Sequence, residues 1–369
     1  MDLVQRINPM KRPPFTLLIT LALALGLTAC AVETVDVEVD VQTTAAPTPQ
    51  PEANNLDSEL SPSEIATLNS LEQIDDYPLY TMAYQTDYQD RAIIQSYNEP
   101  DLLQLREDAW GCSLLVALGD SENLLFGRNF DWVYSPALLL MTDSPSGYAS
   151  ASMVNLGFLG YSADQVNGLA DRPLDDRLAL LDSVYLPIDG FNEMGLAVGM
   201  AAVPGDNPMA DAKPRIGSLG IMRVLLDHAA TVGEAVAIMD GFAIDFSGGP
   251  VVHYLIADAT GRAVLVEYDH GEMHLFYNDS PWHQATNFLR VTEGDSPDGK
   301  CWRYDAIFSW MADRGGVLSE VEAMDLLEDV SQENTQWSVL YDLTDRRLQI
   351  VMGCDYQEVT TLPLDAETK

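Results

Sequence analysis

Cys112, Arg128 and Asp131 lie on a segment whose pattern predicts a β-hairpin. Two apolar runs, residues 113–118 and 124–130, flank the turn-forming sequence Gly-Asp-Ser-Glu-Asn. The cysteine begins the first run, and the arginine and the aspartate lie near the end of the second. The predicted hairpin therefore brings a cation and a carboxylate back towards one thiol.

Gly111 precedes this cysteine, and cleavage of the Gly111–Cys112 bond would give Cys112 a free α-amino group beside its thiol. An α-amino group has a pKa of roughly 7.7–8.0, so part of it is unprotonated at neutral pH. It can take the proton of its own side chain, as in enzymes with an N-terminal threonine nucleophile. Such an enzyme needs no separate histidine base, and the five histidines of this chain lie scattered between residues 228 and 283.

The motif Gly-Cys-Ser followed by Gly-Arg-Asn-Phe-Asp-Trp resembles the nucleophile hairpin of the linear-amide C–N hydrolases. This group of N-terminal-nucleophile hydrolases includes choloylglycine (bile salt) hydrolases, penicillin V acylases, acyl-CoA:6-aminopenicillanic acid acyltransferase-like proteins and, more distantly, acid ceramidase. In the family an arginine and an aspartate follow the cysteine at spacings of 16 and 19, as Arg128 and Asp131 follow Cys112. The resemblance implies a hydrolase of C–N bonds other than peptide bonds, activated by autocleavage at Gly111–Cys112.

Later segments extend the resemblance to about residue 352. Residues 192–196, Asn-Glu-Met-Gly-Leu, resemble a family strand that continues to an oxyanion-binding asparagine, whose position we assign to Ala201. A backbone N–H could replace that missing donor. Asn287 resembles a family asparagine that faces the oxyanion, although it also fits an ordinary loop. Arg303 resembles the last active-site arginine, and it equally fits a helix start.

The resemblance also implies a mechanism. The Cys112 thiolate attacks an amide carbonyl, the amine leaves, and water hydrolyses the acyl-enzyme. Asp131 would orient the α-amino group, and Arg128 would favour the thiolate because a neighbouring cation lowers the pKa of a thiol. Asn287 would donate to the oxyanion. No cofactor is implied.

Two other classes of function fit parts of the sequence. An acyltransferase would use the same fold, with an amine or thiol in place of water. A non-catalytic binding lipoprotein would keep Cys112 buried in an uncut chain. The substrate is not encoded in any motif, so penicillin V, bile-salt amides, N-acyl homoserine lactones and other small N-acyl amides all fit.

A metal site has one candidate. His270, Glu272 and His274 alternate along a predicted strand and would share a face. Two surface histidines beside a turn explain the same pattern, and we favour that interpretation. Our expectation is therefore no metal.

The N-terminal pattern is that of a bacterial lipoprotein signal peptide, residues 1–29. Basic residues precede an apolar core, residues 15–27, that is too short to span a bilayer comfortably. The core ends in Leu-Thr-Ala-Cys, which resembles the lipoprotein cleavage box and implies lipidation of Cys30. We expect an exported protein, lipid-anchored to the cell envelope; a plain secretory signal is the alternative.

The rest of the chain divides into three parts. Residues 30–60 are acidic, rich in proline and poor in large apolar side chains, which predicts a disordered tether. Residues 61–111 would form a propeptide or small subunit, with a helix over 63–74 capped by Ser63 and a tyrosine-rich strip that docks on the catalytic domain. Residues 112–369 would form that domain. The resemblance implies a four-layer αββα sandwich, an α+β fold.

Composition limits the partners. The chain has 19 basic and 57 acidic residues, a net charge of −38, which argues against nucleic-acid binding because phosphates would be repelled. Docking on anionic lipid is disfavoured for the same reason, so membrane attachment would need the lipid anchor. Cys301 and Cys354 could pair in an oxidising compartment or remain two separate thiols. Relatives often assemble, so a homo-oligomer is possible for this chain too.

Overall fold

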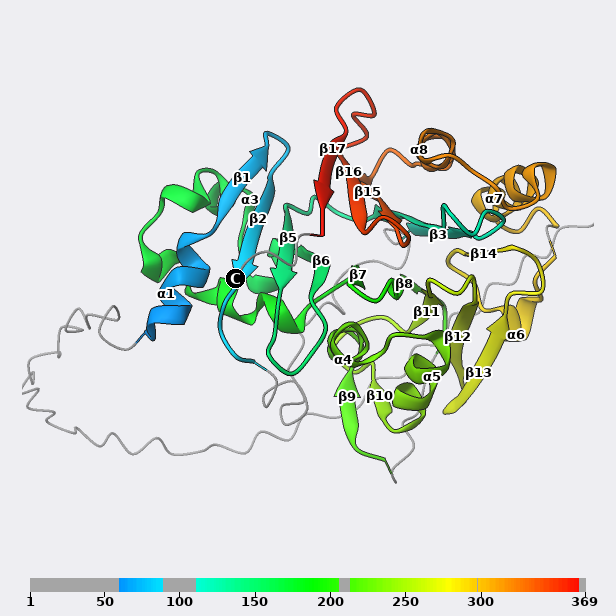
Figure 1. The fold of residues 1–369 in the computed structure, drawn as a ribbon, viewed down its shortest axis with the longest axis horizontal. Coiled ribbons are helices and arrows are strands. Elements are labelled where there is room, and N and C mark those ends of the chain that lie inside the picture. Colours follow the sequence, from blue (N-terminus) through cyan, green and yellow to red (C-terminus); the bar gives the residue numbers. More distant parts are fainter. Residues whose placement is uncertain (1–59, 89–110, 206–212, 297, 365–369) are drawn as a thin grey trace, which may run out of the picture. The chain divides into compact units, whose positions relative to one another are not determined.

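The computed structural model describes residues 60–88, 111–205, 213–296 and 298–364 (Figure 1). The predicted signal peptide, the lipidation site Cys30 and nearly all of the predicted tether lie outside the described residues. Within the described part of the chain, no helix has the length and apolar character needed to cross a membrane.

Two large β-sheets form the centre of the described fold. One has nine strands, in the order β1 (Glu72–Asp75), β2 (Leu79–Tyr84), β5 (Ala137–Thr142), β6 (Ser150–Asn155), β7 (Asp189–Asn192), β8 (Ala197–Ala202), β11 (Val252–Ala257), β12 (Ala263–Asp269) and β13 (Glu272–Tyr277). The other has six, in the order β14 (Trp282–Ala285), β3 (Gly111–Ala117), β4 (Leu125–Asp131), β15 (Thr335–Asp342), β16 (Arg347–Met352) and β17 (Thr360–Pro363).

The two sheets pack face to face, and apolar side chains of both form one continuous core. Gly199 on β8 marks a close approach, because a Cβ there would lie 2.9 Å from Leu114 Cδ2 and 3.1 Å from the Phe126 ring. A larger residue at this position would push the sheets apart. The absence of a side chain on β8 therefore lets the nucleophile strand β3 lie close to the opposite sheet.

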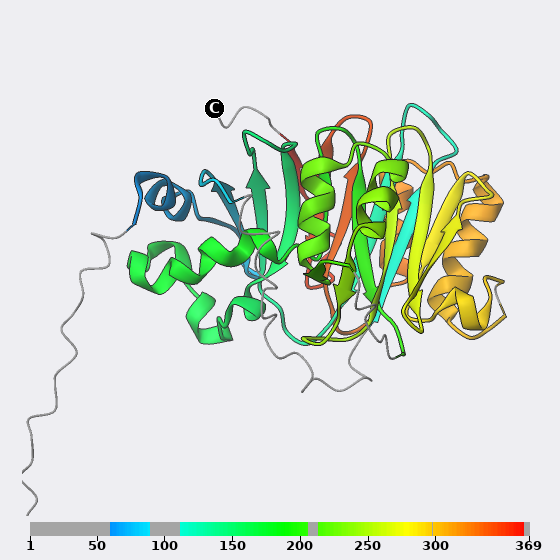
Figure 2. The ribbon, with the colours of Figure 1, turned by 90° about the horizontal axis from the view of Figure 1, so that it is seen from below.

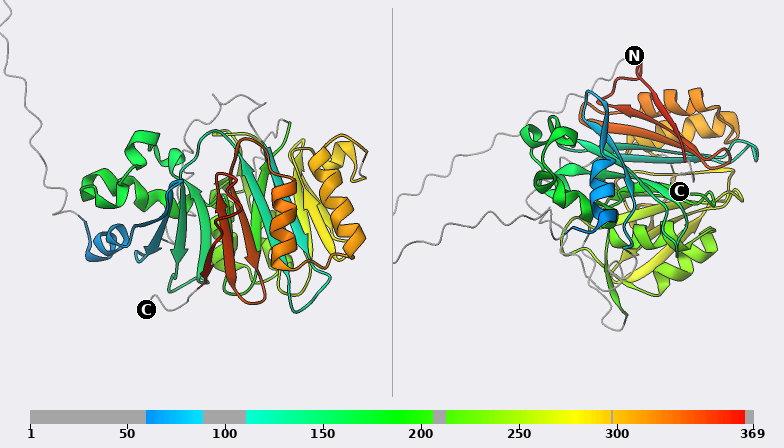
Figure 3. Two further views of the ribbon diagram at one scale, coloured as in Figure 1. Left: turned by 90° about the horizontal axis from the view of Figure 1, so that it is seen from above. Right: turned by 60° about the vertical axis from the view of Figure 1, so that its left-hand side comes forward.

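Helices cover the two outer faces. α4 (Gly220–His228) and α5 (Val232–Asp240) lie on the nine-stranded sheet (Figure 2), and α7 (Trp302–Arg314) and α8 (Glu320–Asp329) lie on the six-stranded sheet (Figure 3). A second apolar cluster joins α7 and α8 to the outward side chains of β3, β4, β15 and β16. The layers thus follow the order α, β, β, α, which confirms the predicted sandwich.

Shorter elements complete the described fold. They are the helices α3 (Ala163–Val166) and α6 (Arg290–Glu293), the 3-10 helices η4 (Leu156–Leu159), η5 (Leu169–Asp171) and η6 (Leu174–Tyr185), and a separate parallel pair of strands, β9 (Arg215–Gly217) and β10 (Ala243–Asp245). β11, β12 and β13 form an antiparallel meander, and a capping box of Thr231 and Glu234 opens α5.

The segment before the nucleophile is built into the sheet. β2 pairs in parallel with β5, so residues from before Cys112 extend the nine-stranded sheet. The helix there, α1 (Pro62–Asn69), is shorter than predicted, and its cap is Ser61 rather than Ser63. Ser61 accepts from the Glu64 N–H while Glu64 accepts from the Ser61 N–H, a full capping box. The predicted last turn is instead strand β1, held by pairing with β2.

The tyrosine-rich strip packs as predicted. Tyr80, Tyr84 and Tyr88 are buried, and each hydroxyl donates to an acceptor later in the chain. Tyr88 donates to Asp227 Oδ1 of α4 at 2.9 Å, and Asp227 also pairs with the fully buried Arg223 at 2.6 Å. The strip therefore docks through hydrogen bonds as well as apolar contact.

Candidate active site

Cys112 is the second residue of β3, and the hairpin register places its partners. β3 and β4 pair so that Gly111 lies opposite Asp131 and Leu114 opposite Arg128. Side chains alternate along a strand, so Cys112 and Leu114 share the face that looks towards the nine-stranded sheet. The predicted hairpin is confirmed, and its thiol is buried, with 4% of the residue exposed.

Arg128 reaches the thiol from the neighbouring strand. Its Nη2 donates to Cys112 Sγ at 3.4 Å. Its Nη1 donates to Asp189 Oδ2 at 2.5 Å and to the Ile188 carbonyl at 3.1 Å. The guanidinium also lies over the Phe130 ring, 4.8 Å from its centroid. The arginine is fully buried, so its charge acts on the thiol with little screening by water.

The pKa of the Cys112 thiol is raised, whereas the sequence led us to expect that Arg128 would lower it. Arg128 and Arg303 both act to lower the pKa of Cys112, as expected of nearby cations. Burial has the larger effect in the opposite direction, so the pKa of the thiol lies above its ordinary value. In the described state, with the Gly111–Cys112 bond intact, the side chain is a thiol and not a preformed thiolate.

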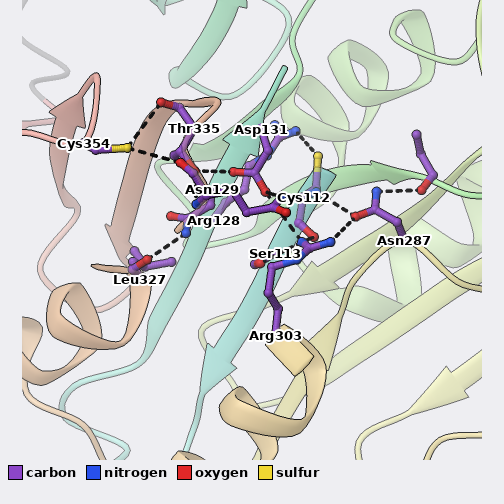
Figure 4. A network of polar contacts seen from close by, with 12 residues as sticks. Cys112, Ser113, Arg128, Asn129, Asp131, Asn287, Arg303, Leu327, Thr335 and Cys354 are labelled. Atoms are coloured by element: carbon purple, nitrogen blue, oxygen red, sulfur yellow. Dashed lines mark hydrogen bonds and ion pairs between the residues drawn. The ribbon is translucent and has the colours of Figure 1, made fainter. Parts of the chain in front are cut away.

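Asn287 and Arg303 hold the backbone of the nucleophile (Figure 4). Asn287 Oδ1 accepts from the Cys112 backbone N–H at 2.8 Å, and its Nδ2 donates to the Ala202 carbonyl at 2.8 Å. Arg303 donates to the Cys112 carbonyl, to Ser113 Oγ at 3.1 Å and to Asn287 Oδ1 at 2.9 Å. Arg303 is also the second residue of α7, as its interpretation as a helix-start residue predicted.

Asp131 lies on the opposite side of the nucleophile strand (Figure 4). Thr335 Oγ1 donates to its Oδ1 at 2.5 Å, and Gln332 Nε2 donates to its Oδ2 at 2.5 Å. Arg303 Nη1 is 3.6 Å from Oδ2. A Cβ on Gly111 would lie 2.8 Å from that same Oδ2. The carboxylate is therefore fixed against the residue that precedes the nucleophile.

An apolar cavity opens beside Cys112. Most of its lining is apolar and comes from several elements. The lining residues are Cys112, Arg128, Phe130, Trp132, Phe158, Met200, Ala202, Ser218, Leu219, Gly249, Pro250 and Val252.

The structure corrects our assignment of the oxyanion-donor position to Ala201. Ala201 is buried and shares a face with Gly199, towards β3, but it is not among the residues that line the cavity. Its neighbours Met200 and Ala202 are, and the Ala202 carbonyl is the group that binds Asn287. Because successive residues of a strand face opposite sides, an assignment shifted by one position selects the wrong wall.

The remaining sequence-based candidates lie elsewhere. Cys301 and Cys354 are free thiols, so the alternative of two separate cysteines holds in this structure. His270 lies in an exposed turn, and no group of histidine, cysteine or acidic side chains within the described ranges is arranged to hold a metal ion.

A family model matches the part of the chain that carries most of this site. The model of the linear amide C–N hydrolases, choloylglycine hydrolase family, matches residues 112–290, which begin at the buried cysteine and contain Arg128, Asp131 and Asn287. Over these residues the chain is similar to this family. The match indicates a hydrolase of linear amide C–N bonds, and its scaffold is the four-layer αββα sandwich described above.

Solved structures of the same kind are distant in sequence. Penicillin V acylase from Agrobacterium tumefaciens is 16% identical and aligns over 69% of this chain and 92% of its own, with a TM-score of 0.45. A mutant conjugated bile acid hydrolase from Clostridium perfringens is 15% identical over 68% and 92%, with a TM-score of 0.47. The Caenorhabditis elegans ortholog of N-acylethanolamine-hydrolyzing acid amidase is 13% identical over 68% and 100%, with a TM-score of 0.42. No curated protein matches the sequence.

Three residues at the centre of this hydrolase were not singled out as site residues from the sequence. Gln332 and Thr335 bind Asp131, and Asp189 binds Arg128. Asp189 is the first residue of β7 and precedes the family-like segment 192–196, and Thr335 is the first residue of β15. A polar residue at the start of a buried strand was the available signal.

Proposed function

We propose that this hydrolase is a cysteine N-terminal-nucleophile amidohydrolase that cleaves a small N-acyl amide after autocatalytic cleavage at Gly111–Cys112. The observation that carries the proposal is that the side chains of Arg128 and Asn287 both contact Cys112, which lines an apolar cavity. Arg128 Nη2 lies 3.4 Å from Sγ, and Asn287 Oδ1 lies 2.8 Å from the backbone nitrogen. These are the two atoms of Cys112 that the reaction uses.

The first reaction is cleavage of the chain. Cys112 Sγ attacks the Gly111 carbonyl carbon, and a thioester forms as the Gly111–Cys112 C–N bond breaks. The nitrogen takes up the thiol proton and becomes the α-amino group. Water then hydrolyses the thioester and leaves a carboxylate on Gly111. The hydrogen bond from Arg303 to the Cys112 carbonyl supports this step, because it fixes the strand that follows the scissile bond.

The second reaction is hydrolysis of the substrate. The α-amino group takes the thiol proton, Sγ attacks the acyl carbon, and the protonated amino group supplies the proton with which the amine leaves. Water then releases the carboxylic acid. The Asn287 amide plane is fixed by Ala202, and we assign its second Nδ2 hydrogen to the oxyanion. Loss of one such donor typically lowers kcat by about 100- to 1,000-fold.

The cavity favours an uncharged acyl group. Phe130 and Trp132 stack at 5.8 Å and present flat aromatic surface, and Phe158, Leu219 and Val252 add aliphatic and aromatic walls. A charged acyl group would lose its hydration there, which is costly, and the charged lining residue Arg128 is already paired with Asp189. Fatty acyl and aromatic acyl amides, including penicillin V, therefore fit better than acyl groups that end in a charge.

We also propose the location of this chemistry. The lipoprotein box at Cys30 would tether the enzyme to the cell envelope, outside the cytoplasm, through the acidic segment 30–60. Labelling with an alkyne fatty acid tests this. Incorporation into the wild type and its loss in Cys30→Ala is the expected result, and unlabelled wild-type protein would contradict it.

Intact-mass measurement of protein made without the signal peptide tests the main proposal. The wild type should split between Gly111 and Cys112, and Cys112→Ala should stay whole. The processed enzyme should then hydrolyse N-acyl amides in a series from acetyl to dodecanoyl. An uncut wild-type chain would refute the α-amino mechanism. Transfer of the acyl group to an added amine in preference to water would instead indicate an acyltransferase.

A further inference from the structure

Arg128 has a fully buried counter-ion. Its Nη1 and Asp189 Oδ2 are 2.5 Å apart, and both side chains have no exposed surface. The pair spans the two sheets, because Arg128 lies on β4 and Asp189 on β7. A charge buried this deeply requires a partner, so the arginine that touches the nucleophile depends on this carboxylate.

Asp189 is itself held by three donors. Besides Arg128, it accepts from the Tyr341 hydroxyl at Oδ1 and from Trp337 Nε1 at 3.4 Å. Both of these side chains lie on β15 of the opposite sheet and are fully buried. The packing of the two sheets therefore fixes the orientation of the Asp189 carboxylate. The carboxylate in turn fixes the position of the Arg128 guanidinium.

We propose that Asp189 is a positioning residue that aims Arg128 at the Cys112 thiol and compensates most of the arginine's charge there. This inference rests on the proposed role of Cys112 as nucleophile. The consequence is a resting enzyme that keeps its nucleophile protonated until the α-amino group removes the proton. The arginine then stabilises the sulfur as negative charge develops on it.

The charged groups that face the sulfur define the test. They are Arg128 and Asp131 from β4, Arg303 from α7 and, in the processed enzyme, the α-amino group of Cys112 itself. Asp189 and Tyr341 face the opposite side of the Arg128 guanidinium. Burial raises the pKa of Cys112 despite the cations.

Alkylation of Cys112 by iodoacetamide in the processed enzyme measures the charge at the sulfur directly. The modified peptide is quantified by mass spectrometry as a function of pH. In Asp189→Asn the arginine loses its counter-ion, and the alkylation midpoint should fall by about one pH unit, which is about tenfold faster alkylation at a fixed pH below the midpoint. Hydrolysis should slow at least tenfold, because Arg128 is no longer held. Tyr341→Phe, which keeps the Asp189 charge, should leave the midpoint in place.

The double variant Arg128→Gln with Asp189→Asn separates charge from loosened packing, and it remains informative where the single variant does not fold. It is neutral, as the native pair is neutral, so its midpoint should return to within about half a unit of the wild type. A midpoint that stays low would mean that water enters the site, and one that rises by a unit or more would mean that Arg128 acts uncompensated. Either result overturns the inference, as does an unchanged midpoint in Asp189→Asn. Failure of the wild type to process refutes the proposed function instead.

Discussion

Replacing Gly111 by alanine should slow self-cleavage and leave the mature catalytic chain unchanged. The new Cβ would lie 2.8 Å from Asp131 Oδ2 and 2.9 Å from Asp131 Cβ, and it would overlap Gln332 Nε2. Carbon contacts are favourable only at about 3.5–4.0 Å. The Asp131 side chain or the strand must therefore retreat by about 1 Å. Because a displacement of about 1 Å can cost about 100-fold in rate, we expect cleavage to be about 100-fold slower.

A time course of intact mass on freshly purified precursor measures this effect. After cleavage, residues 112–369 are identical to the wild type, so hydrolysis per processed molecule should stay within about twofold if the new C-terminal alanine leaves the site. Gly233→Ala on α5 is the matched control, because its Cβ would meet only Thr231 Oγ1 at 3.9 Å. It should mature at the wild-type rate.

Two outcomes would count against this reasoning. Maturation of Gly111→Ala at the wild-type rate would mean that the fixed Asp131 carboxylate does not set the geometry of cleavage. Equal slowing of maturation in Gly233→Ala would mean that the effect reflects folding of the precursor. In either case the close packing of Asp131 against Gly111 would have no role in the reaction.

Three further predictions test other parts of the structure. Tyr88→Phe removes a buried donor to Asp227 and should lower the free energy of unfolding in urea by about 1–3 kcal/mol. After processing, the segment before Cys112 should dissociate from the catalytic chain at a lower urea concentration in gel filtration. Unchanged dissociation would contradict the anchoring role of Tyr88. Leu219→Phe fills part of the cavity and should displace two methylenes of a long acyl chain, which costs about 1.6 kcal/mol. The kcat/KM for dodecanoyl amides should therefore fall about fifteenfold, while that for acetyl amides stays unchanged. An equal loss for both substrates would show that Leu219 does not line the acyl site. Burial lowers the pKa of His283 to about 4 from 6.5, so as pH falls the unfolded chain binds this proton first and stability is lost between pH 6.5 and 4. Over that window the free energy of unfolding of the wild type in urea should drop by about 3 kcal/mol more than that of His283→Gln. Equal drops for the two proteins would refute a buried, neutral His283.

The hairpin and its chemistry were readable from the sequence for a local reason. Cys112, Arg128 and Asp131 belong to two adjacent strands joined by one polar turn, so their register depends on a short segment and its turn residues. The capping boxes of α5 and α8 are local in the same sense, since the side chains of Ser or Thr and of Glu three positions later accept from each other's backbone N–H groups. Asn287 and Arg303 required the family resemblance, because no local pattern links them to the hairpin.

Contacts between sheets and across long sequence distances were decided only by the tertiary structure. Thr335 reaches Asp131 because β15 pairs with β4 in one particular register, and the apolar pattern of β15 alone is compatible with other partners. Asp189 reaches Arg128 because the two sheets stack face to face. The direction of the Cys112 pKa shift is of the same kind. The sequence contains the cation that lowers it, but the burial that raises it is a property of the packed core.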